Sequence, residues 1–205
     1  MLRTIARASL LMILAFSAVA QTATQQAPAA AAKKQLRQPD VIFVPTPEQV
    51  VDAMLTVAKV GKGDVLYDLG SGDGRIPIRA AQKYGVERAI GIDINPDRIK
   101  EANENLAKAG VGKRVRFINA DLFQAKLSDA TVITLYLLPA LNLKLLPKLL
   151  KETKPGTRVV SHAFDMGTWK AEQTLDVEGR NVYFWTIPAP GTPAYEAAMA
   201  AAQGK

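Results

Sequence analysis

The chain has no cysteine among its 205 residues, and its only histidine is His162. The absence of cysteine excludes disulfides, thiolate zinc sites and cysteine nucleophiles. It says little about the cellular compartment, because a cysteine-free chain folds in either redox setting. Apolar residues make up 48% of the sequence, so length and composition predict one domain of ordinary size with a full hydrophobic core.

A concentrated basic region is also missing. The formal net charge is +7, and two arginines in the first twenty residues account for two of these charges, which leaves +5 for the rest of the chain. Proteins that bind nucleic acids usually gather their basic residues on one face. The lysines and arginines here are scattered along the sequence, so we interpret them as solvated surface and expect no nucleic-acid partner.

Residues 1–20 are typical of a secretory signal peptide. Two arginines form a positive start, and residues 9–20 form an apolar run that ends in Ala18-Val19-Ala20, which resembles a cleavage site. The run is shorter than the roughly 20 residues that span a bilayer. We therefore expect a periplasmic or secreted protein with no stable membrane span after cleavage. An uncleaved N-terminal membrane anchor is the alternative.

The rest of the chain divides into three parts. Residues 21–40 are low in complexity and lack a core-forming pattern, which predicts a flexible linker. The folded domain is expected at residues 41–188, followed by a loose tail at residues 189–205. We expect this domain to be a monomer.

Helical and strand patterns alternate through the domain. Strands are expected at residues 65–69, 87–93, 114–119, 130–138 and 156–162, and helices at about 47–59, 75–85, 95–110 and within 141–153. Thr46 is expected to cap the first helix, with Gln49 completing a capping box. The strands 174–177 and 181–187 read as a closing antiparallel hairpin. This order predicts an α/β, Rossmann-like, doubly wound and mostly parallel sheet, with its ligand at the carboxyl ends of the strands.

The stretch DLGSGDGR, residues 68–75, leaves the first strand and opens a helix. Its alternate glycines let the backbone turn with positive φ and let a ligand approach closely. The spacing is not the G-x-G-x-x-G of dinucleotide sites, because Arg75 stands where the third glycine would be, and no G-K-[ST] of a Walker A loop is present. A tight turn that binds nothing is the alternative.

Carboxylates at successive strand ends favour a cationic ligand. Asp68 and Asp73 lie in the glycine loop, where they would repel a pyrophosphate. Asp93 ends the second strand, where it can accept both hydroxyls of a ribose, and Asp121 follows the third strand, where it can accept from an adenine amino group. This set fits S-adenosylmethionine, which carries an ammonium and a sulfonium. Alternatively, Asp73 and Asp93 cap the helices that follow them and Asp121 is a surface turn residue.

The stretches DVLYDLGSGDGRIPIRAA, GIDINP and VRFINADLF, in this order, resemble the class I S-adenosylmethionine-dependent methyltransferases over residues 41–187. The resemblance implies a seven-stranded sheet of order 3-2-1-4-5-7-6 with an antiparallel strand 7. It also implies S-adenosylmethionine as the cofactor, with no metal. The residues implied to bind the cofactor are Asp68, Gly70, Ser71, Gly72, Asp73, Gly74, Asp93, Ile94, Asp121 and Leu122.

A narrower resemblance rests on VPTPEQVVDAML, on LYLLP after the fourth strand and on SHAFDMGTW after the fifth. These stretches are similar to the group that contains the ATP synthase c-subunit lysine methyltransferase and its bacterial relatives, which implies a lysine in a protein as methyl acceptor. Tyr136 is then expected to be a catalytic residue that lines a lysine channel by cation–π contact; a half-buried core tyrosine is the alternative. No D/N-P-P-Y/F motif follows the fourth strand, which argues against a DNA base methylase.

Other residues near the expected acceptor admit two interpretations. His162 either contacts substrate or is a hydrogen-bonded structural residue, and the second is favoured. Phe164, Asp165 and Trp169 either form a rim over the acceptor or pack in the interior. Only about eleven residues, 163–173, precede the hairpin, too few for a further crossover helix, so the substrate side is expected to be open. Three lysines are expected on the solvated face of the leucine-rich helix: Lys144, Lys148 and Lys151.

Three functions remain open from sequence: a protein-lysine methyltransferase, a small-molecule methyltransferase, and a non-catalytic exported protein that binds S-adenosylmethionine or S-adenosylhomocysteine. An open acceptor face favours the first, and a lid made by residues 21–47 favours the second. The third draws on a conflict, because an exported enzyme has no evident supply of this cofactor. Methyl transfer requires an in-line approach of the acceptor, and an apolar channel favours the neutral amine, so no dedicated base is required.

Overall fold

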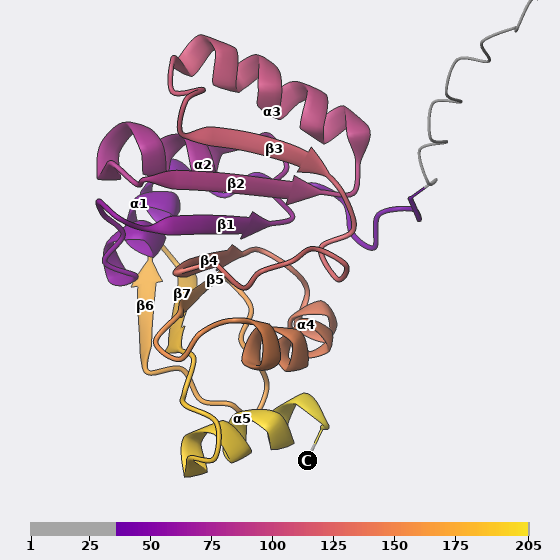
Figure 1. The fold of residues 1–205 in the computed structure, drawn as a ribbon, viewed down its shortest axis with the longest axis vertical. Coiled ribbons are helices and arrows are strands. Elements are labelled where there is room, and N and C mark those ends of the chain that lie inside the picture. The colour runs from indigo at the N-terminus through magenta and orange to yellow at the C-terminus, as the bar shows by residue number, and fades with distance from the viewer. Residues whose placement is uncertain (1–35, 205) are drawn as a thin grey trace, which may run out of the picture. The chain divides into compact units, whose positions relative to one another are not determined.

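The computed structural model describes residues 36–204, so the predicted signal peptide and most of the predicted linker lie outside the described residues. Seven strands form one sheet of order β3-β2-β1-β4-β5-β7-β6 (Figure 1). The strands are β1 (Val65–Leu69), β2 (Arg88–Asp93), β3 (Val115–Asn119), β4 (Val132–Leu135), β5 (Arg158–His162), β6 (Gln173–Val177) and β7 (Arg180–Thr186). β1 to β5 are parallel, and β7 is antiparallel to both β5 and β6. The predicted fold class and strand order are confirmed.

Helices cover both faces of the sheet. The elements are α1 (Glu48–Val57), α2 (Arg75–Arg79), the π-helical turn η1 (Ala80–Tyr84), α3 (Pro96–Ala109), α4 (Pro139–Glu152) and α5 (Pro193–Ala202). Leu66 and Val132 belong to the apolar cluster that α1 and α2 cover, whereas Tyr67 and Ile133 belong to the cluster that α4 and α5 cover. Because successive strand residues point to opposite faces, near-continuous apolar strands supply two cores.

The first helix departs from its prediction. α1 begins at Glu48, and Thr46 does not cap it. The Thr46 hydroxyl instead lies 3.2 Å from His162 Nδ1 at the end of β5, and Gln49 donates to Glu178 in the hairpin turn. The predicted capping box is therefore wrong, because tertiary partners take both side chains. The contact between Thr46 and His162 connects the segment before α1 to the end of β5.

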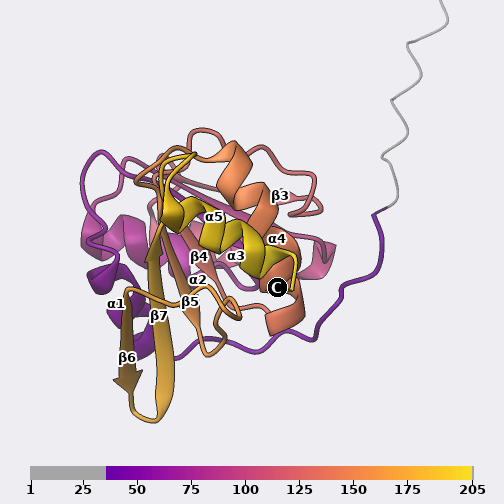
Figure 2. The ribbon, with the colours of Figure 1, turned by 90° about the horizontal axis from the view of Figure 1, so that it is seen from below.

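The predicted loose tail is also wrong. Residues 193–202 form α5, in which the Thr192 side chain accepts from the backbone N–H of Tyr195 at the helix start. α5 lies beside α4 (Figure 2), and buries Ala198 and Ala201 in the core that α4 covers. Between β5 and β6 there is no helix among residues 163–172, only an isolated bridge between Met166 and Trp169. α5 therefore covers sheet surface that the short β5–β6 connection leaves open.

Two local features fix the ends of elements. Asn95 caps α3 by accepting from the backbone N–H of Asp97. The hairpin between β6 and β7 turns at Glu178 and Gly179, which both have positive φ, as a two-residue turn with the twist of the flanking strands requires. Within residues 36–204, no helix combines the length and hydropathy that a bilayer span requires.

Candidate functional site

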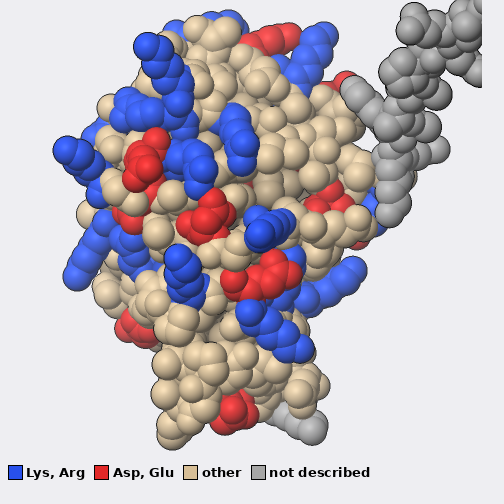
Figure 3. Space-filling model, viewed as in Figure 1, with Lys and Arg blue, Asp and Glu red and all other residues tan. Residues whose placement is uncertain are grey.

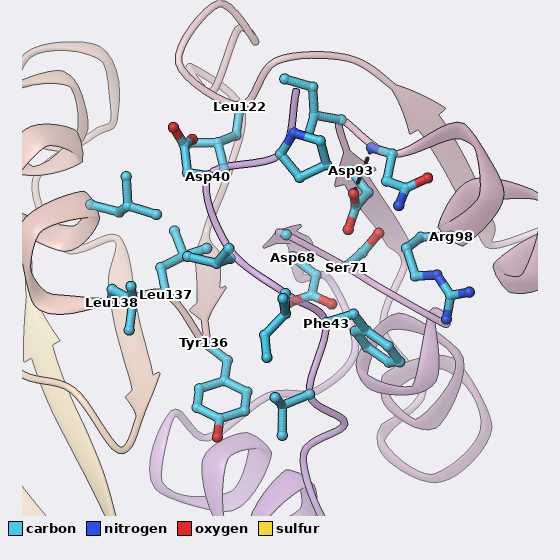
Figure 4. A pocket seen from close by; sticks show the side chains of 18 of the residues that line it. Asp40, Phe43, Asp68, Ser71, Asp93, Arg98, Leu122, Tyr136, Leu137 and Leu138 are labelled. Atoms are coloured by element: carbon cyan, nitrogen blue, oxygen red, sulfur yellow. Dashed lines mark hydrogen bonds between the residues drawn. The ribbon is translucent and has the colours of Figure 1, made fainter. Parts of the chain in front are cut away.

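The carboxyl ends of the central strands open into a cavity of about 530 Å³. This volume lies in the range of ~300–1,000 Å³ that small ligands occupy in proteins. The turn after β1 and the ends of β2 and β4 line it, and residues 37–46, here called the strap, run across it (Figure 4). The cavity lies where parallel sheets of this topology bind ligands.

The glycines of the loop let aromatic side chains of neighbouring segments pack closely against its backbone. Gly72 and Gly74 both have positive φ, 50° and 81°. A Cβ at Gly72 would stand 2.1 Å from a ring carbon of Phe43 in the strap, and one at Gly74 would stand 2.3 Å from a ring carbon of Phe117 in β3. Side chains at these positions would displace aromatic rings as well as strain the turn. The two glycines therefore let the strap and β3 close on the loop.

Asp68 lies at the end of β1 and points toward the cavity (Figure 4). Its carboxylate is buried and accepts a hydrogen bond of 2.6 Å from the Thr134 hydroxyl on β4. Burial raises the pKa of Asp68 to about 7, the Thr134 hydrogen bond opposes this rise, and the nearby Asp93 and Asp73 add to it. The carboxyl therefore titrates near neutral pH, and a cation in the cavity would favour its ionised form.

Asp93 and Ser71 both line the cavity, and their side-chain oxygens can form further hydrogen bonds with a ligand there. The Asp93 carboxylate accepts from the backbone N–H groups of Gly72 and Asn95, at 2.9 and 2.8 Å. Each carboxylate oxygen can accept a second hydrogen bond. The buried Ser71 hydroxyl has no hydrogen-bond partner within the described part of the chain. A buried polar atom without a partner beside an acid-lined cavity indicates a polar ligand there.

The other two acidic candidates are held by arginines. Asp73 accepts from the Arg75 side chain and also from the backbone N–H of Arg75, the first residue of α2, whereas the N-cap position of this helix is Gly74. Asp121 accepts from Arg37 Nε at 2.9 Å and from the backbone N–H of Phe123. Burial would raise the pKa of Asp121, but these two hydrogen bonds outweigh it and lower the pKa. Asp121 does not line the cavity, so a contact with adenine stays a prediction.

The strap is fastened at both ends. At one end Arg37 reaches Asp121, and at the other Arg75 donates to the carbonyl of Thr46 at 2.9 Å. Between these two fastenings, the ring of Phe43 lies next to the glycine loop and under the guanidinium of Arg98. The Cζ atom of Arg98 is 5.1 Å from the centroid of the Phe43 ring. The prediction of a flexible linker up to residue 40 is therefore wrong for Arg37, because an ion pair with a residue 84 positions away places it on the domain.

Tyr136 and Phe164 form an aromatic end of the cavity. Tyr136 follows β4, lines the cavity, and its hydroxyl makes no hydrogen bond to any residue between 36 and 204. The centroid of the Tyr136 ring lies 3.9 Å from that of His162, which does not line the cavity, and 6.2 Å from that of Phe164. Burial lowers the pKa of His162 to about 4, with a smaller effect from Arg180. His162 is thus neutral and structural, as the favoured interpretation held.

A strained turn places Phe164. Ala163 has φ of 63°, and the N–H of Phe164 donates to the carbonyl of His162 two residues back. The buried Asn142 of α4 donates to the carbonyls of Phe164 and Asp165, at 3.2 and 3.1 Å. Positive φ at a non-glycine residue persists only where surrounding contacts impose it, and Asn142 supplies those contacts.

The remaining candidates lie away from the cavity. Asp165 is exposed and accepts from the N–H of Gly167, and Trp169 packs against Trp185, whose indole N–H donates to the carbonyl of Trp169. Of the three helix lysines, Lys144 and Lys151 are exposed, whereas Lys148 is half-buried and pairs with Glu152. No cluster of metal-binding side chains is found among residues 36–204.

Sequence analysis missed four residues that shape the cavity: Arg37, Phe43, Arg98 and Asn142. Arg37 and Phe43 lie in or beside a segment without core periodicity, so nothing local indicated that they pack on the glycine loop. Asn142 stands in a leucine-rich helix, where a lone amide among apolar positions was a usable signal.

The family is decided by comparison with known proteins. A model of the ANTKMT methyltransferase domain matches residues 68–173, slightly more than half of the chain. The chain belongs to the ANTKMT methyltransferase family. The match begins at Asp68 and ends at Gln173, so it contains the glycine loop, Asp93 and the aromatic end of the cavity but not the strap.

Relatives of this ANTKMT-family chain are methyltransferases. It is 48% identical over 153 residues to a protein-lysine N-methyltransferase of Saccharolobus islandicus, a match that covers 73% of this chain and 95% of that protein. It is 29% identical over 134 residues to the human ATP synthase c-subunit lysine N-methyltransferase, covering 65% of this chain and 56% of that protein. The resemblance to this group, predicted from sequence, is confirmed.

A solved structure is also similar. The RNA methyltransferase of Salinibacter ruber, in complex with S-adenosylhomocysteine, is 56% identical with a TM-score of 0.71, and the match covers 73% of this chain and 97% of that one. The ANTKMT-family chain is therefore an S-adenosylmethionine-dependent methyltransferase. The acid-lined cavity and the unpartnered Ser71 hydroxyl fit this cationic cofactor. The contacts assigned to individual residues stay predictions.

Proposed function

We propose that this protein methylates the side-chain amine of lysine in a protein substrate. The observation that carries the proposal is the 48% identity to a protein-lysine N-methyltransferase of which this chain covers 95%. The aromatic end of the cavity supports it, because the rings of Tyr136 and Phe164 line the cavity and can stabilise the positive charge of an ammonium group or of the nitrogen as it takes the methyl group.

In this proposal, some residues of the cavity bind the cofactor and others position the lysine. When bound, S-adenosylmethionine supplies an electrophilic methyl group on a sulfonium. Asp68 and Asp93, on β1 and β2, would hold its cationic and hydroxyl groups, and Gly70 and Ser71 of the glycine loop would lie beside it. Tyr136 and Phe164 would hold the lysine side chain along the line of attack.

No dedicated base is required for this transfer. His162 does not line the cavity, and Tyr136 stacks on its ring, so the imidazole is not placed to take the lysine proton. The apolar walls instead favour the neutral amine, because desolvation lowers the pKa of a lysine. Leu137 and Leu141 belong to these walls together with the two aromatic rings.

Two other acceptors have a specific observation in their favour. The similar Salinibacter ruber protein is an RNA methyltransferase, and the strap crosses the cavity like the lid expected for a small-molecule enzyme. Against RNA, lysine and arginine side chains alternate with acidic ones across the face shown in Figure 3 and do not gather into one stripe. Against a closed small-molecule site, the strap exposes apolar side chains at the cavity mouth.

The test uses the purified full-length protein and S-adenosylmethionine carrying a labelled methyl group. Membrane, periplasmic and cytosolic protein fractions and total RNA are offered in separate reactions. The proposal predicts label on a protein band, recovered as methyl-lysine after hydrolysis. Label confined to RNA or to small solutes would overturn it.

Residues 1–20 support a second proposal, export across the membrane. Their charged start, apolar run and Ala-x-Ala end match a signal peptide. Fractionation of cells with N-terminal sequencing of the product tests this. A product that begins near residue 21 outside the cytosol is expected, a membrane-bound uncleaved product would indicate an anchor, and an uncleaved cytosolic product would contradict export.

A further inference from the structure

The exposed large hydrophobic side chains of residues 36–204 all line the same cavity. They are Ile42 (86% exposed), Phe43 (39%), Val44 (48%) and Leu138 (47%). Three of them belong to the strap, and Leu138 follows Tyr136 by two residues at the start of α4. We call Ile42, Val44 and Leu138 the apolar rim. Exposed apolar side chains that gather at one cavity, rather than scattered singly, indicate an interaction site.

Backbone groups of the strap are also free to form hydrogen bonds with a partner. Residues 41–44 are neither helix nor strand, and their N–H and C=O groups form no hydrogen bond with the described part of the chain. The fastenings at Arg37 and Thr46 nevertheless hold this segment in place from both sides. A fixed segment with unpaired backbone groups is a template on which an extended polypeptide can pair, with specificity supplied by neighbouring side-chain contacts.

We propose that the apolar rim docks an extended, apolar stretch of the substrate polypeptide next to the target lysine. The inference rests on the proposed function, since it assigns the residues that flank the lysine rather than the lysine itself. The substrate is the occupant that this position favours, because the rim lines the same cavity as Tyr136 and Phe164, the residues proposed to hold the lysine. A polar flank would leave the rim in water, whereas an apolar flank removes both surfaces from water.

The charged groups around the rim agree with this occupant. The cationic groups near the cavity mouth are already engaged: Arg37 pairs with Asp40 and Asp121, and Arg98 pairs with Glu101 and covers Phe43. They therefore offer little attraction to an acidic flank or to a phosphate backbone. Selection by the rim is accordingly expected to depend on apolar side chains beside the lysine and to persist at high salt.

The test compares two peptides of equal length, each with one central lysine. One carries Val-Ile before the lysine and Val-Leu after it, and the other carries Ser-Gly and Gly-Ser. The full-length protein is expected to methylate the apolar peptide with kcat/KM at least tenfold higher. In the double variant Ile42→Ser, Leu138→Ser, this preference should fall below threefold. The matched control, Ile42→Leu with Leu138→Met, should keep the preference.

Three outcomes would overturn the proposal. Equal kcat/KM on the two peptides would refute apolar docking and leave lysine methylation standing if a protein band is labelled in the test above. An equal loss on both peptides in the serine variant would show that the rim serves the cavity and not the flank. Binding to phosphatidylcholine–phosphatidylglycerol vesicles that disappears in the serine variant, with peptide preference unchanged, would assign the rim to a lipid surface.

Discussion

The ring of Tyr136 lies against the ring of His162, with centroids 3.9 Å apart and planes inclined by 37°. His162 in turn contacts the Thr46 hydroxyl at the end of the strap, so one imidazole joins β5, the aromatic end of the cavity and the strap. Burial holds this imidazole neutral. The only histidine of the chain is therefore a structural residue that connects three parts of the site.

His162 is expected to titrate with a pKa of about 4, well below the usual value near 6.5. The unfolded chain binds the proton more readily between these two values, so the contribution of His162 to the free energy of unfolding should fall as the pH drops from about 6.5 to 4, opposite in direction to the contribution of Asp68. Because the chain has one histidine, its imidazole resonances in an NMR titration report this residue alone. An observed pKa near 6.5 would contradict the packing described for the ring.

Tyr136 is expected to act on the acceptor and not on the cofactor. The acceptor nitrogen becomes positively charged as it takes the methyl group, and a ring face lost from a desolvated cation costs about 2 kcal/mol, so Tyr136→Ala should lower kcat/KM for the lysine substrate roughly thirtyfold. The affinity for S-adenosylhomocysteine should change less than threefold. Tyr136→Phe, which keeps the ring and its contact with His162, is the control and should retain most of the activity. A loss as large in Tyr136→Phe would assign the role to the hydroxyl.

Asp68 is expected to link cofactor binding and stability to pH in opposite directions. Its pKa in the free protein is about 7, so affinity for S-adenosylmethionine should rise as the pH increases through 7 and the carboxylate ionises. The folded state holds this proton more tightly than the unfolded state, so the contribution of Asp68 to the free energy of unfolding should fall as the pH rises from about 4 to 7. Calorimetric titration measures the effect on affinity, and the difference in denaturant unfolding between the wild type and Asp68→Asn across this range measures the effect on stability.

The control for Asp68 is Asp68→Asn, in which the amide oxygen can still accept from Thr134. This variant should unfold at higher denaturant concentration than the wild type at pH 8, where the wild-type carboxylate is ionised and buried. Its cofactor affinity should be weak and nearly independent of pH. A variant that binds the cofactor as tightly as the wild type would refute a direct role for this carboxylate.

α5 is expected to be part of the domain. A chain that ends at Pro188 loses the cover over the core beneath α5, including the contacts of Tyr195 and Met199. Burial of side chains of this size contributes about 1.5–3 kcal/mol each at most, so the truncated protein should unfold at least ~2 kcal/mol more easily. Denaturant unfolding measures the difference. Truncation after Ala202, which keeps the whole helix, is the control, and equal stability of the two forms would show that α5 does not support the core.

The sheet and the glycine turn could be predicted because their signals are local. The strand VLYDL, the glycine turn that follows it and the closing hairpin each depend on neighbours in sequence. The order of strands followed from the family resemblance, which the comparisons confirm. The acids at the ends of β1 and β2 were predicted to meet because parallel strands end at one edge.

The strap and α5 could not be predicted in the same way. Arg37 meets Asp121 across 84 positions, and Thr46 meets His162 across 116. Neither pair leaves a periodic pattern. α5 did carry a signal, since Thr192 and Pro193 are a favoured helix start, but its alanine-rich composition does not form an apolar stripe and looked like a low-complexity tail. Contact with α4, rather than its own pattern, settles its place.

The central claim is that the acid-lined cavity holds S-adenosylmethionine, and titration of S-adenosylhomocysteine into the full-length protein by calorimetry tests it most directly. The wild type should bind one equivalent, and Asp93→Ala should bind at least roughly tenfold more weakly, because each hydrogen bond to a charged group contributes about 1.5–3 kcal/mol. Lys113→Ala, an exposed residue outside the cavity, should bind as the wild type does. No binding by the wild type, or unchanged affinity in Asp93→Ala, would contradict the account.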